Sequence, residues 1–295
     1  MNLNNKGTTK TAIENSVELT ALPNKGQDVF TNTNPLWAFA PARPIYGGTC
    51  IAHCLVAAQH TVPSDFFIHN MQCCFIKAGY SEFSIEYFVE RVRNGKWFAT
   101  RVVNARQKGE TIFTATASFV REDIDSTREE RRLEHERKMP PDLILPDQTE
   151  MDGKAEDGPF ETRRAEILNK RSGHFADTKI RYWFRTKETI PKESGYRAHL
   201  AALAYMSDAY LIAAAVEAHG HIPIVTYPIR FSMIASLNHT IYFHNPKAVQ
   251  VDQWMCSERE SPWAGDNRGL VIQSIWSHEG VLIATCVQEV SFSIY

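Results

Sequence analysis

Residues 108–117 read KGETIFTATA, and residues 279–288 read EGVLIATCVQ. Each stretch begins with a charged residue and a glycine, which favour a tight turn, and continues into apolar and β-branched side chains, which favour a strand. The two glycines, Gly109 and Gly280, are 171 positions apart. A turn and strand that recur at this distance predict that one structural unit occurs twice in the chain.

The residues before the first stretch predict a helix and an antiparallel meander. Residues 49–61 are apolar, with Ile51 and Leu55 at helical spacing. Strands are predicted at 66–76, 84–93, 97–105 and 111–120. Asn94-Gly95 separates two of these strands, and this pair favours a hairpin because both residues tolerate positive φ.

The second half repeats this order. Residues 199–219 predict one long apolar helix, with Gly220 as the residue that ends it. Strands are predicted at 238–244, 253–260, 269–277 and 281–294. Both helices are apolar on nearly every side, so each must be buried. An antiparallel sheet wrapped around a buried helix is the hotdog arrangement, and two copies predict an α+β double hotdog.

Charged side chains concentrate between the two halves. From residue 121 to residue 170, 25 of 50 residues are charged, against 41 of the other 245. We therefore expect an N-terminal hotdog repeat at 1–120, a charged and exposed linker at 121–174, and a C-terminal hotdog repeat at 175–295. Within the linker, Ser126 and Glu129 fit a capping box that would start a short polar helix ending at Lys138.

Composition excludes several classes of protein. The 32 basic and 34 acidic residues give a net charge of -2, which argues against nucleic acid as a partner. No apolar run is long enough for a membrane-spanning helix, and the polar N-terminus lacks the apolar core of a signal peptide. The six cysteines include no C-x2-C pair, which argues against a zinc site, and buried thiols in a reducing compartment are favoured over a disulfide framework. Neither a metal nor a cofactor is expected.

Short motifs occur along the chain in a defined order. They include Tyr46-Gly47-Gly48, His69-x5-Phe75-x3-Gly79, Asn94-Gly95-x2-Phe98-x2-Arg101, Met139-Pro140, Ser207-Asp208, Ser236-Leu237-Asn238-His239-Thr240 and Val287-Gln288-Glu289. In this order and spacing the chain resembles the acyl-CoA thioesterase II family, the TesB-like double-hotdog thioesterases. The resemblance extends from about Val17 to the end of the chain.

The resemblance implies hydrolysis of fatty acyl-CoA to a free acid and CoA, with the catalytic residues in the C-terminal repeat. Family members position a water molecule with an Asp, a Thr and a Gln, and these roles fall on Asp208, Ser236 and Gln288. Two departures from the family pattern stand out. Ser236 keeps the hydroxyl of the usual Thr, and Asn238 replaces a common Asp, which would remove a charge near the site.

The residue types themselves are consistent with this chemistry. Asp208 is the only acidic residue between Glu193 and Glu217, and a carboxylate within so apolar a helix is costly unless it is hydrogen-bonded. Gln288 can hold a water without competing for its proton. Alternatively, Asp208 faces solvent and Gln288 pairs with backbone groups. No Gly-x-Ser-x-Gly motif occurs, so direct attack by water is favoured over Ser236 as a covalent nucleophile.

Three further residues are expected to bind substrate: His239, beside the site, and Gly47 and Gly48. Backbone N–H groups at a helix N-terminus would stabilise the oxyanion. The first half lacks an equivalent set, because its helix carries no Asp or Glu and Ala117 lies 171 positions before Gln288. One active site per chain is therefore expected.

Two other functions stay open. A double hotdog that binds acyl groups, or serves a biosynthetic pathway, without hydrolysis is compatible with the two departures. An acyl-CoA hydratase or dehydratase would carry an Asp-x-Asn-Pro-x-His motif, which the chain lacks. We expect a homo-oligomer, a dimer or larger. The expected location is cytoplasmic or peroxisomal, although the chain ends in Ser-Ile-Tyr rather than a Ser-Lys-Leu signal.

Overall fold

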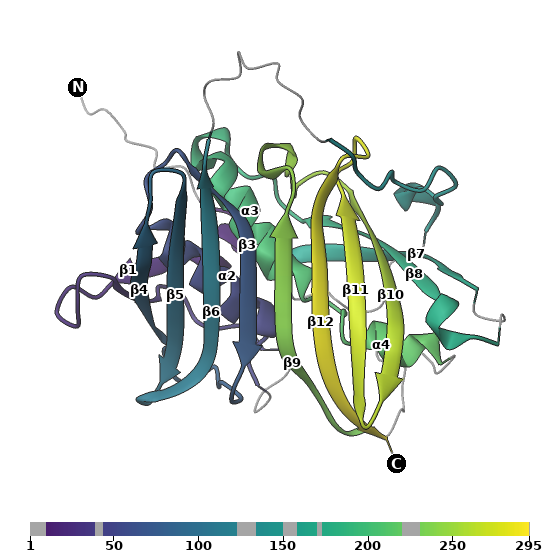
Figure 1. Cartoon of the computed structure of the whole chain (residues 1–295), viewed down its shortest axis with the longest axis horizontal. Coiled ribbons are helices and arrows are strands. Elements are labelled where there is room, and N and C mark those ends of the chain that lie inside the picture. The colour runs from purple at the N-terminus through teal and green to yellow at the C-terminus, as the bar shows by residue number, and fades with distance from the viewer. Residues whose placement is uncertain are drawn as a thin grey trace, which may run out of the picture.

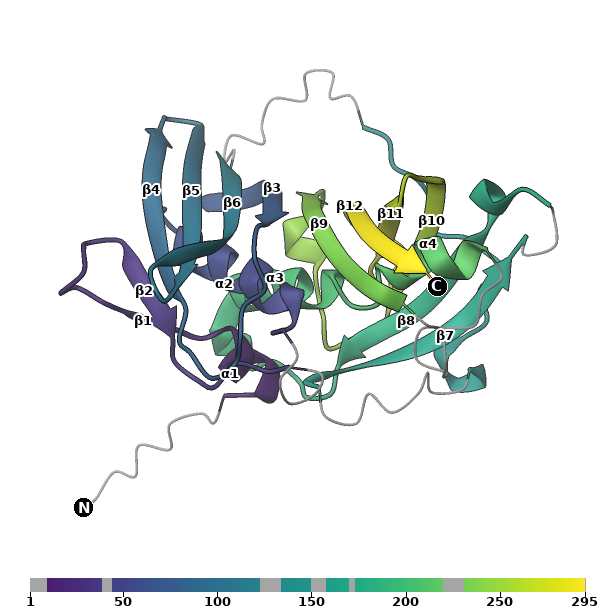
Figure 2. The same ribbon diagram turned by 90° about the horizontal axis from the view of Figure 1, so that it is seen from below.

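The computed structural model of the chain describes residues 10–38, 44–122, 134–149, 158–169, 173–219 and 231–294. Within these residues the strands form one large antiparallel sheet, and helices cover one of its faces (Figure 1). Figure 2, turned by 90°, shows both halves of the sheet curving around the helices. This is the α+β double hotdog that the sequence predicts.

The elements follow the predicted order, with additions at both ends of the sheet. The helices are α1 (Ala12–Val17), α2 (Gly47–Gln59), α3 (Gly195–Ser207) and α4 (Ala213–Ala218), with short 3₁₀ helices at Pro146–Gln148, Phe175–Asp177, Lys192–Ser194 and Pro246–Ala248. The strands are β1 (Leu19–Ala21), β2 (Val29–Asn32), β3 (Phe66–Phe75), β4 (Glu86–Asn94), β5 (Phe98–Gln107), β6 (Glu110–Arg121), β7 (Phe160–Leu168), β8 (Lys179–Thr186), β9 (Phe231–Phe243), β10 (Met255–Gly265), β11 (Arg268–Trp276) and β12 (Leu282–Ile294).

The order of the described strands shows the internal repeat. It runs β1-β2-β4-β5-β6-β3-β9-β12-β11-β10-β8-β7, so the two halves meet at the antiparallel pair β3–β9. At the centre of this pair Gln72 faces Thr240. Moving outward, β6, β5 and β4 on one side correspond to β12, β11 and β10 on the other. The two halves are therefore related by an approximate twofold axis through the centre of the sheet.

Helices α2 and α3 pack against each other inside the curved sheet. Their backbones approach so closely that a Cβ atom on Gly48 would lie 2.1 Å from the carbonyl oxygen of Tyr205. The hydroxyl of Tyr46 donates to that same carbonyl at 2.8 Å. Glycine is thus required where the two helices cross. The predicted helix at 49–61 is confirmed, two residues earlier than expected.

The second predicted helix is not continuous. Helix α3 ends at Ser207, Asp208 occupies its C-cap, and α4 begins only at Ala213. Tyr210 between them has a φ of 55°, in the left-handed region, which a continuing α-helix cannot contain. The apolar composition predicted helix throughout because it carries no signal for this break. Gly220 lies outside the described residues.

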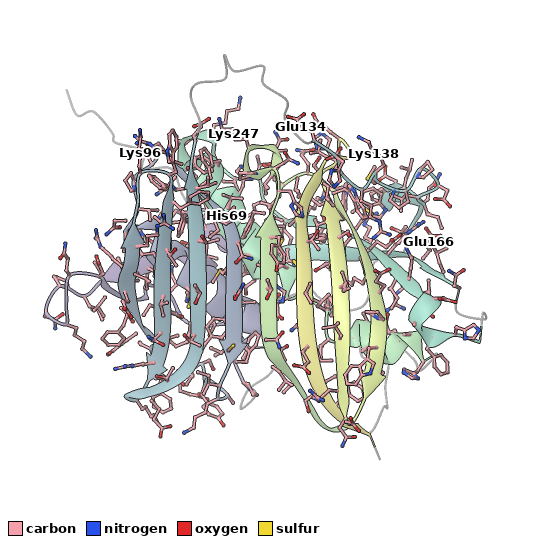
Figure 3. All side chains as sticks on the ribbon, in the orientation of Figure 1. His69, Lys96, Glu134, Lys138, Glu166 and Lys247 are labelled. Atoms are coloured by element: carbon pink, nitrogen blue, oxygen red, sulfur yellow. The ribbon has the colours of Figure 1, made fainter. Side chains whose placement is uncertain are left out.

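The charged linker contains more structure than expected. Residues 160–168 form β7, the edge strand of the sheet. Residues 134–149 lie over the outer face of the sheet. There the indole N–H groups of Trp276 and Trp183 donate to the backbone oxygens of Arg137 and Ile144, at 2.9 and 2.7 Å. Figure 3 labels Lys138, which belongs to residues 134–149, and Glu166, which lies on β7. Residues 134–138 are not helical. The proposed cap, Ser126 and Glu129, lies outside the described residues.

The six cysteines are free thiols, as expected from the sequence. Five are buried, and Cys74 is exposed because it alternates with the buried Cys73 along β3.

Candidate active site

The three predicted catalytic residues come together at one point in the C-terminal half. Asp208 lies at the C-terminus of α3, Ser236 on β9 and Gln288 on the adjacent β12. The side-chain amide of Gln288 donates to Asp208 Oδ1 at 3.0 Å and to Ser236 Oγ at 2.5 Å. Gln288 is fully buried. Both protons of its amide nitrogen are therefore committed to the other two residues.

A β-bulge turns Ser236 toward this point. In the β9–β12 ladder Gln288 pairs with His239 and Glu289 with Asn238, but Val290 pairs with Ser236, so one residue is skipped. Without the bulge, Ser236 would lie on the opposite face from His239, because side chains alternate along a strand. The extra residue restores Ser236 to the inner face.

The N-terminus of α2 forms the other wall of the site. The backbone N–H of Gly48 donates to the Asp208 carboxylate. A Cβ atom on Gly47 would lie 2.6 Å from Asp208 Oδ2, so only glycine leaves room for the carboxylate here. The predicted substrate-binding glycines thus contact Asp208 directly. The positive end of the α2 dipole also lies at this point.

Asp208 has the titration behaviour of a general base for neutral pH. Burial raises the pKa of Asp208 from 3.8 to about 6, although the Gln288 and Gly48 hydrogen bonds act to lower it. Burial is thus the dominant effect, as expected for a carboxyl group among apolar residues. A carboxylate with this pKa is ionised at neutral pH and remains a better proton acceptor than an ordinary Asp.

His239 is buried beside Gln288 and also lies within hydrogen-bond distance of Ser207. The hydroxyl of Ser207 donates to the backbone oxygen of Ala204 at 2.9 Å. The same hydroxyl lies within hydrogen-bond distance of His239 Nε2, at 3.1 Å. Burial lowers the pKa of His239 to about 4, although a hydrogen bond with the Gln288 side chain acts to raise it. The imidazole is therefore neutral at physiological pH.

Two buried polar atoms in the site meet the geometric criteria for a hydrogen bond with no described residue. They are His239 Nδ1 and Gln288 Oε1, on residues that face each other across β9 and β12. Rotating the Gln288 amide would place its oxygen against the Asp208 carboxylate, so the orientation is fixed. A water molecule, which can both donate and accept, is the group that complements these atoms.

Asn238 and Ser207, which neighbour the site residues, lie in positions that the sequence did not predict. Asn238 does not contact the three site residues: its side chain lies beside Glu289, donating to the Glu289 carboxylate at 3.2 Å and accepting from the Glu289 backbone N–H at 3.1 Å. The Asp-to-Asn departure therefore removes no charge from direct contact with the site. Ser207 contributes to the site but was not assigned a role from the sequence. Its position next to Asp208 is the signal that could have identified it.

In the described part of the first half, apolar residues occupy the positions equivalent to the site. Strand β3 has a bulge between Ile68 and Asn70, as β9 has beside Ser236, and His69 at that bulge is labelled in Figure 3. Aligning the two bulges places Ile68 at the position of Ser236. Likewise the pair Met71–Ala117 takes the position of His239–Gln288. Apolar side chains thus replace the polar groups at the related site.

Comparison with known proteins agrees with this architecture. Residues 34–120 match the family described as the acyl-CoA thioesterase N-terminal domain, and residues 140–292 match the acyl-CoA thioesterase C-terminal domain. Acyl-coenzyme A thioesterase 8 of Homo sapiens is 30% identical over 273 residues, covering 85% of this chain and 81% of that protein. Acyl-CoA thioesterase 2 of Haemophilus influenzae is 29% identical, covering 84% and 87%.

A solved structure shares the whole fold. The acyl-CoA thioesterase II TesB2 from Mycobacterium marinum superimposes with a TM-score of 0.75 at 26% identity, covering 96% of this chain and 99% of that one. The repeat, the two matched domains and the near full-length relatives all point to one family. The chain therefore belongs to the acyl-CoA thioesterase family and is an acyl-CoA thioester hydrolase with a double-hotdog fold.

Proposed function

We propose that Asp208, Ser236 and Gln288 bind and activate the water molecule that hydrolyses the thioester of a fatty acyl-CoA. The observation that carries this proposal is the Gln288 amide, which hydrogen-bonds to both other residues while its oxygen lacks a partner among the described atoms. Water donating one proton to the Asp208 carboxylate and the other to Gln288 Oε1 would present an oxygen lone pair to the substrate.

The reaction balances with one base. The water oxygen forms a bond to the thioester carbonyl carbon while Asp208 takes a proton. The tetrahedral oxyanion is stabilised by the N-terminus of α2 at Gly47, where backbone N–H groups and the helix dipole favour negative charge. When the C–S bond breaks, Asp208 returns its proton to the CoA sulfur. His239 stays neutral and positions Gln288 from the neighbouring strand.

A thiol-release assay with a panel of acyl-CoAs tests the assignment. We expect Asp208→Ala and Gln288→Ala each to lower kcat by at least about 100-fold, because each removes a group that holds or activates the water. Glu289→Ala is the matched control, since Glu289 follows Gln288 on β12 but faces away from the site. Undiminished activity in both site variants would refute the assignment. Acyl-CoA binding by the wild type without CoA release would instead identify a non-hydrolytic acyl-binding protein.

Oligomeric state and location stay predictions. Among the described residues, no helix has the length and hydropathy needed to span a bilayer. A relative from Saccharomyces cerevisiae, 24% identical, is named a peroxisomal acyl-coenzyme A thioester hydrolase, which supports the peroxisome over the cytoplasm. Light scattering of the purified chain tests the expected homo-oligomer, and microscopy of a chain tagged at its N-terminus tests the location.

A further inference from the structure

The hairpin that joins β4 and β5 exposes large apolar side chains. Val92, Trp97 and Phe98 are 54%, 47% and 42% exposed. The β4–β5 ladder skips Arg91 and Val92, so a bulge carries Val92 out of the regular pairing. Single exposed apolar residues are normal, whereas a contiguous group marks a surface that another molecule covers. We call residues 91–98 the β4–β5 tip.

The β4–β5 tip is also basic. Residues 91–98 include three basic residues and no acidic residue. One of them, Arg91, forms an ion pair with Asp28 at 2.6 Å. The other two, Arg93 and Lys96, are exposed. The Lys96 ammonium lies 5.2 Å from the centre of the Trp97 ring, close enough to interact with its face. Two exposed positive charges therefore lie beside the exposed apolar side chains.

An apolar groove continues from the tip. Phe98 pairs with Val120 on β6, and Val120 pairs with Phe67 on β3. The groove beside them has a volume of about 350 Å3, and its lining includes Phe67, Val120, Pro246 and Lys247. Lys96 at the tip and Lys247 at the groove lie at the same end of the sheet (Figure 3). Tip and groove therefore form one apolar surface with basic residues around it.

The corresponding hairpin of the second half provides an internal comparison. In the β10–β11 ladder, as in the β4–β5 ladder, two residues of the first strand lie opposite one of the second at the bulge. This hairpin also has an exposed aromatic ring, Trp263, which is 44% exposed. However, residues 261–268 contain one acidic and one basic residue, and the basic one, Arg268, pairs with Glu289 at 2.8 Å. The positive charge of the β4–β5 tip is thus not a consequence of the fold.

We propose that the β4–β5 tip docks the enzyme on the surface of an anionic phospholipid membrane. Trp97 and Phe98 enter the layer between headgroups and acyl chains, where aromatic rings are favoured. Arg93 and Lys96 stay level with the anionic headgroups, which attract them. A tip of eight residues offers far less than the roughly 800 Å2 per partner that a stable protein interface buries, which favours lipid over a protein partner.

Docking has a consequence for access to substrate. A long-chain acyl-CoA is an amphiphile that partitions into the same membranes, so docking keeps the enzyme beside its substrate. The inference does not depend on which residues activate the water molecule. The tip contains none of Asp208, Ser236 and Gln288, so membrane binding and hydrolysis can be measured separately.

Sedimentation with phosphatidylcholine vesicles, with and without phosphatidylserine, tests the proposal. We expect the wild type to bind the phosphatidylserine vesicles more tightly. Lys96→Gln should lower binding to these vesicles about fivefold and leave binding to neutral vesicles unchanged, because one cation is lost. Replacing Trp97 and Phe98 together by Ala should lower binding to both at least about 10-fold. The matched control is Trp263→Ala, which removes a similarly exposed indole from the other hairpin and should change neither.

Two results would overturn the proposal. The first is a wild type that does not sediment with phosphatidylserine vesicles, or that binds them no better than Lys96→Gln and the double Ala variant do. The second is an oligomer that the double Ala variant breaks up, seen by light scattering, without any vesicle binding. The tip would then be a protein interface. Because the substituted side chains are exposed, the melting temperature should stay unchanged.

A further variant keeps the test independent of lost binding. Trp97→Phe retains an aromatic ring, so it should still sediment with phosphatidylserine vesicles. Brominated phospholipid should quench tryptophan fluorescence in the wild type and clearly less in Trp97→Phe, because the indole that enters the bilayer is absent. Equal quenching of the two proteins would place Trp97 outside the bilayer and refute the proposed docking.

Discussion

Replacing Asp208 by Asn should inactivate the enzyme and stabilise it at the same time. In the folded chain burial raises the pKa of this carboxyl from 3.8 to about 6. The folded state therefore binds the proton more tightly than the unfolded chain does. Stability contributed by this group is present at low pH and is lost as the pH rises from about 4 to 6. Above that range the ionised carboxylate is a net cost to folding.

The size of the effect follows from the shift. A change of roughly two pKa units corresponds to about 3 kcal/mol at neutral pH. Because Asp208 as a residue is only partly buried, we expect about 2 kcal/mol. Asn retains an acceptor for Gln288 but turns its NH2 group toward the Gly48 N–H, which costs about 1 kcal/mol. The net expectation is a variant more stable than wild type by about 1 kcal/mol at pH 8.

Urea unfolding at about pH 4.5 and pH 8 measures this difference, with thiol release to confirm the loss of activity. The stability advantage of Asp208→Asn should grow between the two pH values. A matched control is Asp28→Asn. The hydrogen bond from Arg91 holds the pKa of Asp28 below its ordinary value, so this carboxylate stabilises the fold at pH 8 and its loss should destabilise. Identical pH dependence of stability in wild type and Asp208→Asn would refute the assigned burial cost.

Three further results are expected. With thiol release as the measure, kcat should rise through about pH 6 as Asp208 ionises and show no titration of His239 above that, because the pKa of His239 is about 4. Gly48→Ala should lower stability by about 3 kcal/mol or prevent folding, measured by thermal unfolding, because its Cβ would lie 2.1 Å from the Tyr205 carbonyl oxygen. Ser236→Ala should lower kcat about 10-fold, whereas Ser236→Thr, which keeps the hydroxyl bonded to Gln288, should stay within about threefold of wild type.

Local sequence signals predicted the repeat, helix α2, and strands β3 to β6 and β9 to β12. Asn94-Gly95 predicted the β4–β5 hairpin, and the recurring turns at Gly109 and Gly280 predicted the start of β6 and β12. These signals act over a few residues, so they survive in a single sequence. Strands β1, β2, β7 and β8 escaped prediction. The first two are short, and β7 lies in a charged stretch.

The candidate site residues, by contrast, were predicted only through the resemblance of the motifs. Nothing local distinguishes Asp208 from a solvent-facing helix residue or Gln288 from one that pairs with backbone. Their roles depend on atoms distant in sequence, such as the Gly48 N–H. The burial of Arg259 on β10 had no signal in the sequence, since a charged residue on a strand is ordinarily exposed.

The sequence by itself determined that this chain is two copies of a helix and an antiparallel sheet, because periodicity and turn chemistry are encoded locally. Only the tertiary structure decided how that scaffold becomes a site. The break after Ser207 places Asp208 at a helix end, the skipped residue in β9 turns Ser236 inward, and the crossing at Gly48 brings a helix N-terminus to the carboxylate. Each depends on strand register or helix packing between distant segments, which no short stretch of sequence specifies.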